Sequence, residues 1–165
     1  RLEAGQLRLR VANLALPHLL RNVVGAFQPA AESMGIGLSL TLPEQPLPTS
    51  LLGDSEKLEV VMTNLLGNAL KFTERGGTIA VVVRTSSDAV EIDIKDSGVG
   101  IPKDQQRNIF GEFYQVTGPD QNHHDGLGLG LAIVQRIIGE HQGKIKVAAN
   151  QPRGAKFIIE LPTIG

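Results

Sequence analysis

The hydrophobic periodicity of this chain changes repeatedly between the spacing of helices and that of strands. Apolar residues recur every three or four positions, as the buried face of a helix requires, in residues 16–34, 55–72 and 129–141. Alternating or β-branched runs predict strands at residues 38–42, 79–83, 90–94, 145–147 and 157–161. The order predicts an α/β (α+β) fold, a two-layer sandwich in which about three helices cover a mixed, mostly antiparallel sheet of about five strands.

Three shorter segments carry weaker patterns. The first residues read as a helix end broken at Gly5, and the alternation of Leu7, Leu9 and Val11 predicts a strand after it. Residues 104–112 are expected to form a short helix. Residues 117–125 are polar without periodicity, so we expect a mobile loop there.

Composition excludes several kinds of function. A chain of 165 residues fits one domain, and with a formal net charge of −1 and no Lys/Arg block we expect no nucleic-acid partner. The absence of cysteine excludes disulfides and thiolate metal sites. No apolar run approaches the roughly 18 residues of a spanning helix, so we expect no membrane insertion by this chain.

The first candidate site lies on the helix predicted at 55–72. Asn64, Asn68 and Lys71 are spaced i, i+4 and i+7, which places them within an arc of roughly 60° on one helix face. An asparagine carbonyl suits Mg²⁺, and a lysine beside it can neutralise phosphates. The spacing alone leaves a second interpretation, in which these are solvated helix residues.

A second candidate site follows the strand at 90–94. Asp96 begins the sequence DSGVGIP, in which a carboxylate can accept from an exocyclic amine while Gly98 and Gly100 let the backbone approach a flat ring. An ordinary turn can also contain these residues.

A third candidate site is the glycine-rich segment before the last predicted helix. Glycines at a helix start expose backbone amides that bind phosphate, here in the order Gly126, Leu127, Gly128, Leu129 and Gly130. The spacing is neither the GxGxxG dinucleotide fingerprint nor a P-loop. A glycine hinge beneath a loop is the alternative.

In order, NLLGNALKFT, DSGVGIP, IFGEF and GLGLGL resemble the N, G1, F and G2 boxes of sensor histidine kinases. GAKFIIELP resembles the closing G3 segment of the same family. RLEAGQLRL resembles the end of the dimerisation helix with its linker. The resemblance implies the Bergerat sandwich, with residues 1–6 as the end of the dimerisation helix and 7–165 as the catalytic, ATP-binding domain.

The resemblance also implies roles for individual residues, with ATP and Mg²⁺ as the cofactors. Asn68 would coordinate Mg²⁺, and Asn64 and Lys71 would be catalytic, Lys71 contacting phosphate. Phe72 would lie close to the nucleotide. Asp96 would receive the adenine amino group in a pocket shaped by Gly98 and Gly100, with Ile101 beside them. The phosphates would be wrapped by Gly126, Leu127, Gly128, Leu129 and Gly130.

The resemblance assigns two further aromatic residues to the lid, which is the segment at residues 117–125. Phe110 and Phe113 would anchor it, and core packing is the alternative for both. The lid segment 117–125 contains no arginine or lysine, and offers His123 and His124 instead.

The function implied is transfer of the γ-phosphate of Mg·ATP to a histidine on a separate dimerisation domain, and from there to the receiver domain of a response regulator. Hydrolytic relatives place a glutamate four residues before the magnesium asparagine, where this chain has Asn64. The alternatives are a nucleotide-binding regulatory pseudokinase, suggested by the lid, and a hydrolytic member of the superfamily.

None of the four histidines lies in a motif like the family's phosphoacceptor, so we expect the chain not to phosphorylate itself. His141, in the last turn of a predicted helix, is expected to be structural, at a position where a cation favours the helix dipole. We expect a cytoplasmic location, which leaves open an inner-membrane anchor in the parent protein.

Overall fold

The computed structural model describes residues 8–47, 51–106, 108–110 and 127–163. Its three α-helices are α1 (Leu16–Ser33), α2 (Ser55–Phe72) and α3 (Leu127–Glu140). Five strands form the main sheet: β2 (Gly37–Thr41), β4 (Thr78–Thr85), β5 (Ala89–Asp96), β6 (Lys144–Ala149) and β7 (Ala155–Pro162). Their order is β2-β4-β5-β7-β6, with β2 and β4 parallel and every other pair antiparallel. The predicted sandwich is therefore confirmed.

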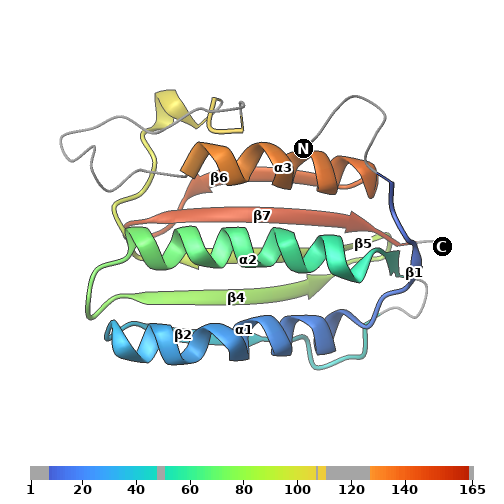
Figure 1. Ribbon diagram of the computed structural model, residues 1–165, viewed down its shortest axis with the longest axis horizontal. Helices are drawn as coiled ribbons and strands as arrows, with labels where there is room; N and C mark the ends of the chain where they lie inside the picture. Colours follow the sequence, from blue (N-terminus) through green and yellow to red (C-terminus); the bar gives the residue numbers. More distant parts are fainter. Residues whose placement is uncertain (1–7, 48–50, 107, 111–126, 164–165) are drawn as a thin grey trace.

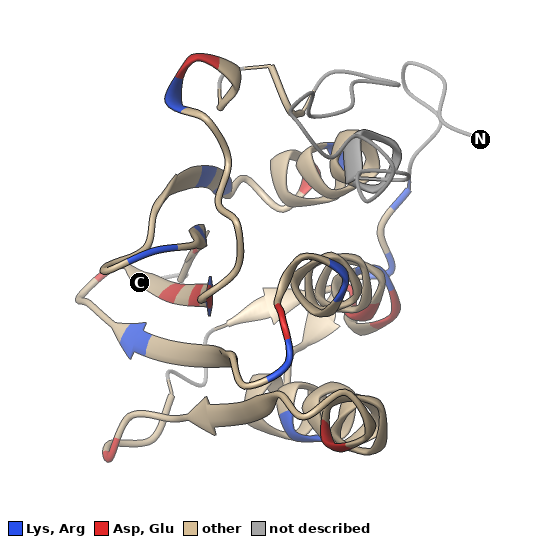
Figure 2. Cartoon of the chain, turned by 90° about the vertical axis from the view of Figure 1, so that its left-hand side faces the viewer, with Lys and Arg blue, Asp and Glu red and all other residues tan. Residues whose placement is uncertain are grey.

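The helices all lie on one face of the sheet. Figure 1 shows α1, α2 and α3 side by side in front of the strands, and the view along the layers in Figure 2 shows the same two layers. Strand residues alternate in burial, and the buried ones pair across the sheet, as Val81 does with Ile94 and Ile94 with Phe157. The core therefore lies between the helices and this sheet face.

No described helix has both the length and the apolar character needed to cross a bilayer.

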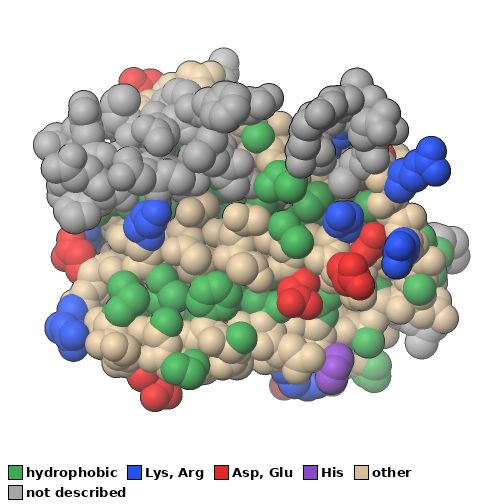
Figure 3. All heavy atoms as spheres, viewed as in Figure 1, with side chains coloured by type: hydrophobic (Ala, Val, Ile, Leu, Met, Phe, Trp, Pro, Cys, Tyr) green, Lys and Arg blue, Asp and Glu red, His purple; other side chains and the backbone are tan. Residues whose placement is uncertain are grey.

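The helical face does expose apolar side chains, which gather between α1 and α2 (Figure 3). A groove there is lined by Val23, Ala26 and Phe27 of α1 and by Glu59 and Thr63 of α2.

The start of α2 is joined to the end of α3. Asp54 caps α2, because its Oδ1 accepts from the backbone N–H of Lys57 at 3.1 Å. The backbone N–H of Asp54 donates to Nε2 of His141 at 2.9 Å, and Nδ1 of His141 lies 2.9 Å from the carbonyl oxygen of Ile137. Nε2 therefore accepts, and both ring nitrogens of His141 are used to hold the start of α2 against the end of α3. The structural role expected of His141 is confirmed.

Two predictions for the shorter segments were also wrong. The strand expected at residues 7–11 is absent from its described part, 8–11, and the chain instead forms the two-residue strand β1 (Ala12–Asn13), which pairs with β3 (Leu52–Gly53). Val11 is 54% exposed, so the alternation there does not face a core. In the described part of 104–112 the chain forms the 3₁₀ helix η1 (Lys103–Gln105) and turns, with Ile109 buried.

Candidate nucleotide-binding site

One pocket brings together the first two candidate sites. Its walls come from α2, from the end of β5 with the turn that follows, and from β7. The lining includes Asn68, Phe72, Asp96, Gly100, Ile101 and Phe157. The pocket is partly open to solvent. A largely apolar wall with few polar groups is typical of a site for a small organic ligand.

Asp96 is the buried charged group of this pocket, with 6% of its surface exposed. Its Oδ1 accepts from the backbone N–H of Gly98 at 2.9 Å and of Ala155 at 3.1 Å. Burial raises the pKa of the Asp96 carboxyl above its usual range, and these two hydrogen bonds offset part of the rise. Both bonds use Oδ1, so Oδ2 is the oxygen that can accept from a ligand.

The turn after Asp96 requires glycine at two positions. A Cβ on Gly98 would collide with the carbonyl oxygen of Phe72, and Gly100 has a φ of +76°, which L side chains rarely adopt. Ser97 fixes the start of this turn, since its Oγ accepts from the backbone N–H of Thr78 at 2.9 Å. Gly98 therefore lets the turn pack directly on the end of α2, while Gly100 lies against Gly154.

Asn68 carries a buried polar atom that the protein does not satisfy. Its Nδ2 has no hydrogen-bond partner within the described part of the chain. A buried amide without a partner costs about 1–3 kcal/mol. Asn68 therefore fits a ligand group, and rotation of the amide presents either its oxygen or its nitrogen to the pocket.

Asn68 also fits an ion of Mg²⁺ delivered with phosphate. Its amide oxygen is a hard neutral ligand, and Mg²⁺ in proteins is commonly held by one or two side-chain oxygens together with substrate phosphates and water. No group of three or more His, Cys, Asp or Glu suited to a metal occurs among the residues the structure describes. The amide oxygen of Asn68 could complete the coordination of a metal whose other ligands are phosphate oxygens and water.

Asn64 and Lys71 lie outside the pocket lining. Nδ2 of Asn64 donates to the carbonyl oxygen of Val60 at 2.8 Å, one turn earlier in α2. Lys71 is exposed. The spacing that groups Asn64 and Lys71 with Asn68 is thus present, but Asn68 alone of the three reaches the pocket.

The third candidate site is described in part. The backbone of residues 127–130, which are Leu127, Gly128, Leu129 and Gly130, forms the first turn of α3, two residues earlier than predicted. Gly126, the lid segment 117–125 and Phe113 lie outside the described residues. Phe110 packs edge-on against Phe157, with ring centroids 6.3 Å apart and planes at 87°. Phe110 thus packs against the core, and its role as a lid anchor stays a prediction.

Sequence reasoning missed the part of the site that comes from the segment joining β6 to β7. Gly154 has a φ of +106°, and a Cβ there would collide with the backbone oxygen of Asp96. Nδ2 of Asn150 donates to that same oxygen at 2.8 Å. The only sequence signal was the resemblance of residues 154–162 to the G3 segment, to which no site residue was assigned.

Comparison with known proteins agrees with this geometry. Residues 53–164 match the family described as "Histidine kinase-, DNA gyrase B-, and HSP90-like ATPase". The signal transduction histidine-protein kinase BarA of Escherichia coli (strain K12) is 35% identical over 161 residues, covering 95% of this chain and 17% of BarA. The sensor histidine kinase RcsC of the same strain is 32% identical over 165 residues, covering 100% of this chain and 17% of RcsC.

Solved structures show the same similarity. The nucleotide-free catalytic domain of the histidine kinase ThkA has a TM-score of 0.81 at 27% identity, covering 94% of this chain and 99% of that one. Full-length ShkA in complex with AMPPNP has a TM-score of 0.82 at 31% identity, covering 98% of this chain and 33% of ShkA. This chain spans 17% of the length of BarA and of RcsC. It belongs to the histidine kinase-, DNA gyrase B- and HSP90-like ATPase family, and over nearly its full length it resembles the catalytic domains of sensor histidine kinases.

Proposed function

We propose that this chain is an ATP-binding catalytic domain that presents the γ-phosphate of Mg·ATP to a histidine on a separate dimerisation domain. The observation that carries the proposal is the Asp96 carboxylate, buried at the end of β5 with Oδ1 held by two backbone amides and the side chain lining a pocket. Such a fixed carboxylate suits the exocyclic amino group of adenine, which donates but does not accept. ShkA, which has the same fold, was solved with the ATP analogue AMPPNP.

The base would lie between α2 and the turn after β5. Phe72, Ile101 and Phe157 offer apolar surface to the ring. Gly98 lets the turn after β5 pack against the backbone of Phe72, and Gly100 lets it pack against the backbone of Gly154. Oδ2 of Asp96 would accept from the amino group. Because the carboxylate is already oriented by the protein, little ordering is needed when the base binds.

The phosphates would extend from the base toward Asn68 and the start of α3. Asn68 would hold Mg²⁺ through its amide oxygen, and Lys71 would contact phosphate from the same helix. The backbone amides at the start of α3, from Gly126 to Gly130, would bind phosphate oxygens. Bound Mg²⁺ would supply neutralisation of the phosphate charge during transfer.

In the transfer step, a nitrogen of the acceptor imidazole forms a bond to the γ-phosphorus while the bond to the bridging β,γ oxygen breaks and ADP leaves. The chain contributes placement and charge neutralisation, which are the main requirements of phosphoryl transfer. Asn64 cannot take a proton at neutral pH, and its amide is bonded to Val60. The absence of a proton acceptor at position 64 argues against efficient activation of water and therefore against the hydrolytic alternative.

The second transfer would pass the phosphoryl group to the aspartate of a response-regulator receiver domain. ThkA, 28% identical with a TM-score of 0.78 over 93% of this chain and 42% of that one, was solved in complex with the response regulator TrrA. That assembly supports receiver domains as the class of downstream partner.

The proposal is tested by mixing this chain with γ-labelled ATP, Mg²⁺ and a separately produced dimerisation domain that carries an acceptor histidine. We expect acid-labile label on the acceptor domain, and much less label at low ATP concentration when Asp96→Ala replaces the wild-type chain. Nucleotide binding without any transfer would favour the regulatory pseudokinase. Steady phosphate release without an acceptor domain would favour the hydrolytic enzyme.

A further inference from the structure

The segment 150–154, which joins β6 to β7, is fastened to the turn at residues 96–100 at several points. Asn150 donates through Nδ2 to the backbone oxygen of Asp96 at 2.8 Å, and its own N–H donates to the oxygen of Gly154 at 2.9 Å. The next residue, Ala155, donates to the Asp96 carboxylate at 3.1 Å. Two stretches more than fifty residues apart in sequence thus form one backbone unit around the proposed base site.

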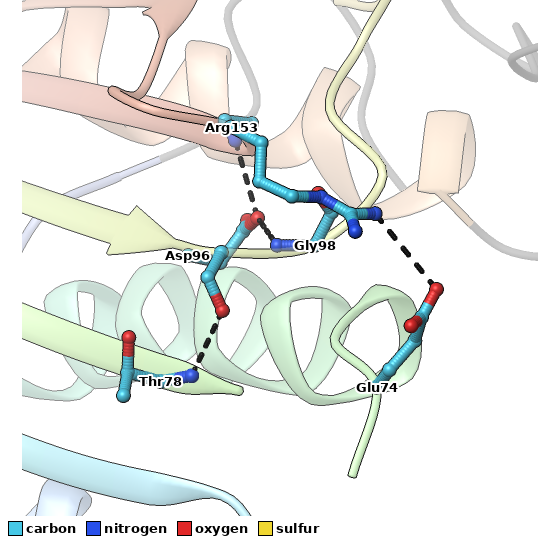
Figure 4. A network of polar contacts seen from close by, with 7 residues as sticks. Glu74, Thr78, Asp96, Gly98 and Arg153 are labelled. Atoms are coloured by element: carbon cyan, nitrogen blue, oxygen red, sulfur yellow. Dashed lines mark hydrogen bonds and ion pairs between the residues drawn. The ribbon is translucent and has the colours of Figure 1, made fainter. Parts of the chain in front are cut away.

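Arg153 adds a side-chain contact to this unit. Its Nε donates to the carbonyl oxygen of Gly98 at 2.9 Å, and its Nη2 lies 3.8 Å from Oε1 of Glu74, just beyond the end of α2 (Figure 4). The side chains of Arg153 and Glu74 are 55% and 72% exposed. An ion pair of that length and exposure contributes little. The hydrogen bond from Nε is therefore the contact that matters.

The acceptor of this bond belongs to a peptide unit that also contacts α2. The carbonyl of Gly98 and the N–H of Val99 lie in one planar group. That N–H donates to the carbonyl oxygen of Phe72 at 3.3 Å. When Arg153 fixes the Gly98 carbonyl, it therefore also fixes the direction of the bond to Phe72.

The preceding peptide unit is held by Asp96. The N–H of Gly98 donates to Oδ1 at 2.9 Å, which orients the carboxylate proposed to receive adenine. Glycine has more backbone freedom to lose than any other residue. A contact that restricts Gly98 before the ligand arrives lowers the ordering cost at the moment of binding.

We propose that Arg153 is a positioning residue for the adenine base, acting through the Gly98–Val99 peptide and not by touching the nucleotide. The inference rests on the proposed function, since it assigns a purpose to the turn that carries Asp96. The group that matters is the N–H at the Nε position of Arg153, which donates to the carbonyl oxygen of Gly98. The charge of the guanidinium and its pairing with Glu74 are secondary.

A matched pair of variants isolates that donor. In Arg153→Gln the side-chain amide nitrogen sits at the same place along the chain as Nε and can still donate. In Arg153→Met that place is taken by a methyl group. Glu74→Gln serves as the control for the ion pair.

The measurement is titration calorimetry of each variant with adenosine, ADP and ATP, together with thermal unfolding of the nucleotide-free chains. Arg153→Met is expected to weaken binding by about three- to tenfold, the loss of one ordinary hydrogen bond. The loss should be equal for all three ligands, because the effect is on the base. Arg153→Gln and Glu74→Gln are expected to stay within about twofold of wild type. The thermal midpoint of the free Met variant should lie slightly below that of the free Gln variant, because the same hydrogen bond also forms without nucleotide.

Three results would overturn the inference. The first is wild-type affinity in Arg153→Met. The second is a loss confined to ATP, which would make the guanidinium a phosphate contact. The third is a lowered midpoint of the free Met variant with intact affinity, which would make Arg153 a purely structural residue. If the wild-type chain binds no adenine ligand, the proposed function itself fails, so the two failures are distinguishable.

Discussion

Replacement of Asp96 by asparagine separates binding from stability. Asparagine has nearly the same shape, and its Oδ1 can keep accepting from the backbone N–H groups of Gly98 and Ala155. The second carboxylate oxygen becomes an amide nitrogen, which donates. It would then face the adenine amino group, which also donates.

The expected loss of affinity follows from the lost charged acceptor. A hydrogen bond to a charged group contributes about 1.5–3 kcal/mol, so Asp96→Asn should bind ATP and adenosine about 10- to 150-fold more weakly. Titration calorimetry against the wild-type chain measures this directly. Affinity equal to that of wild type would refute the assignment of Asp96 to the base.

The stability of the nucleotide-free Asp96→Asn variant, unlike its affinity for ATP, should not fall. Burial raises the folded-state pKa of Asp96 above its unfolded value, so the unfolded chain loses its proton first as pH rises. This carboxyl therefore lowers stability between the two pKa values and keeps that cost at neutral pH. Asp96→Asn removes the ionisation, so at pH 7 the nucleotide-free variant should be at least as stable as wild type. Urea unfolding from pH 4 to 7 measures it, and a clear destabilisation at pH 7 would contradict the reasoning.

Three further predictions concern the metal, the joining segment and the helix ends. Asn68→Ala should abolish the increase in ATP affinity that Mg²⁺ produces and leave adenosine affinity unchanged, in calorimetry with and without Mg²⁺; an unchanged Mg²⁺ effect would exclude Asn68 as ligand. Gly154→Ala should lower the free energy of unfolding in urea by about 1–3 kcal/mol, because the φ of Gly154 is +106°. The control Gly139→Ala should not lower it, because nothing lies within 4 Å of the added Cβ. His141→Ala should lower the free energy of unfolding by about 1–3 kcal/mol because it removes the acceptor for the backbone N–H of Asp54. An unchanged midpoint of urea unfolding would show that water replaces this acceptor.

The helices, and the part of the pocket formed by α2 and the turn after β5, could be predicted because their signals lie in consecutive residues. The apolar face of α2 can be read from consecutive residues, and α2 ends at Phe72 as predicted. Asp96 ends β5, next to a turn in which Gly98 is required by contact with Phe72 and Gly100 by its φ of +76°. Here periodicity, turn chemistry and the family resemblance agree.

The rest depended on contacts between distant residues. Nothing near Asn150 or Arg153 in the sequence indicates that both reach the turn after Asp96. The polar face of α2 likewise gave no sign that Asn64 bonds to its own helix while Asn68 reaches the pocket. Local alternation at residues 8–11 failed because Val11 has no core to face.

The pocket between α2 and the end of β5 is proposed to receive adenine. A crystal structure of this chain with Mg²⁺ and a non-hydrolysable ATP analogue would show where the base binds. We expect the exocyclic amino group within about 3.2 Å of the Asp96 carboxylate, and Mg²⁺ coordinated by Asn68. A nucleotide bound elsewhere, or bound in this pocket with its base turned away from Asp96, would contradict it.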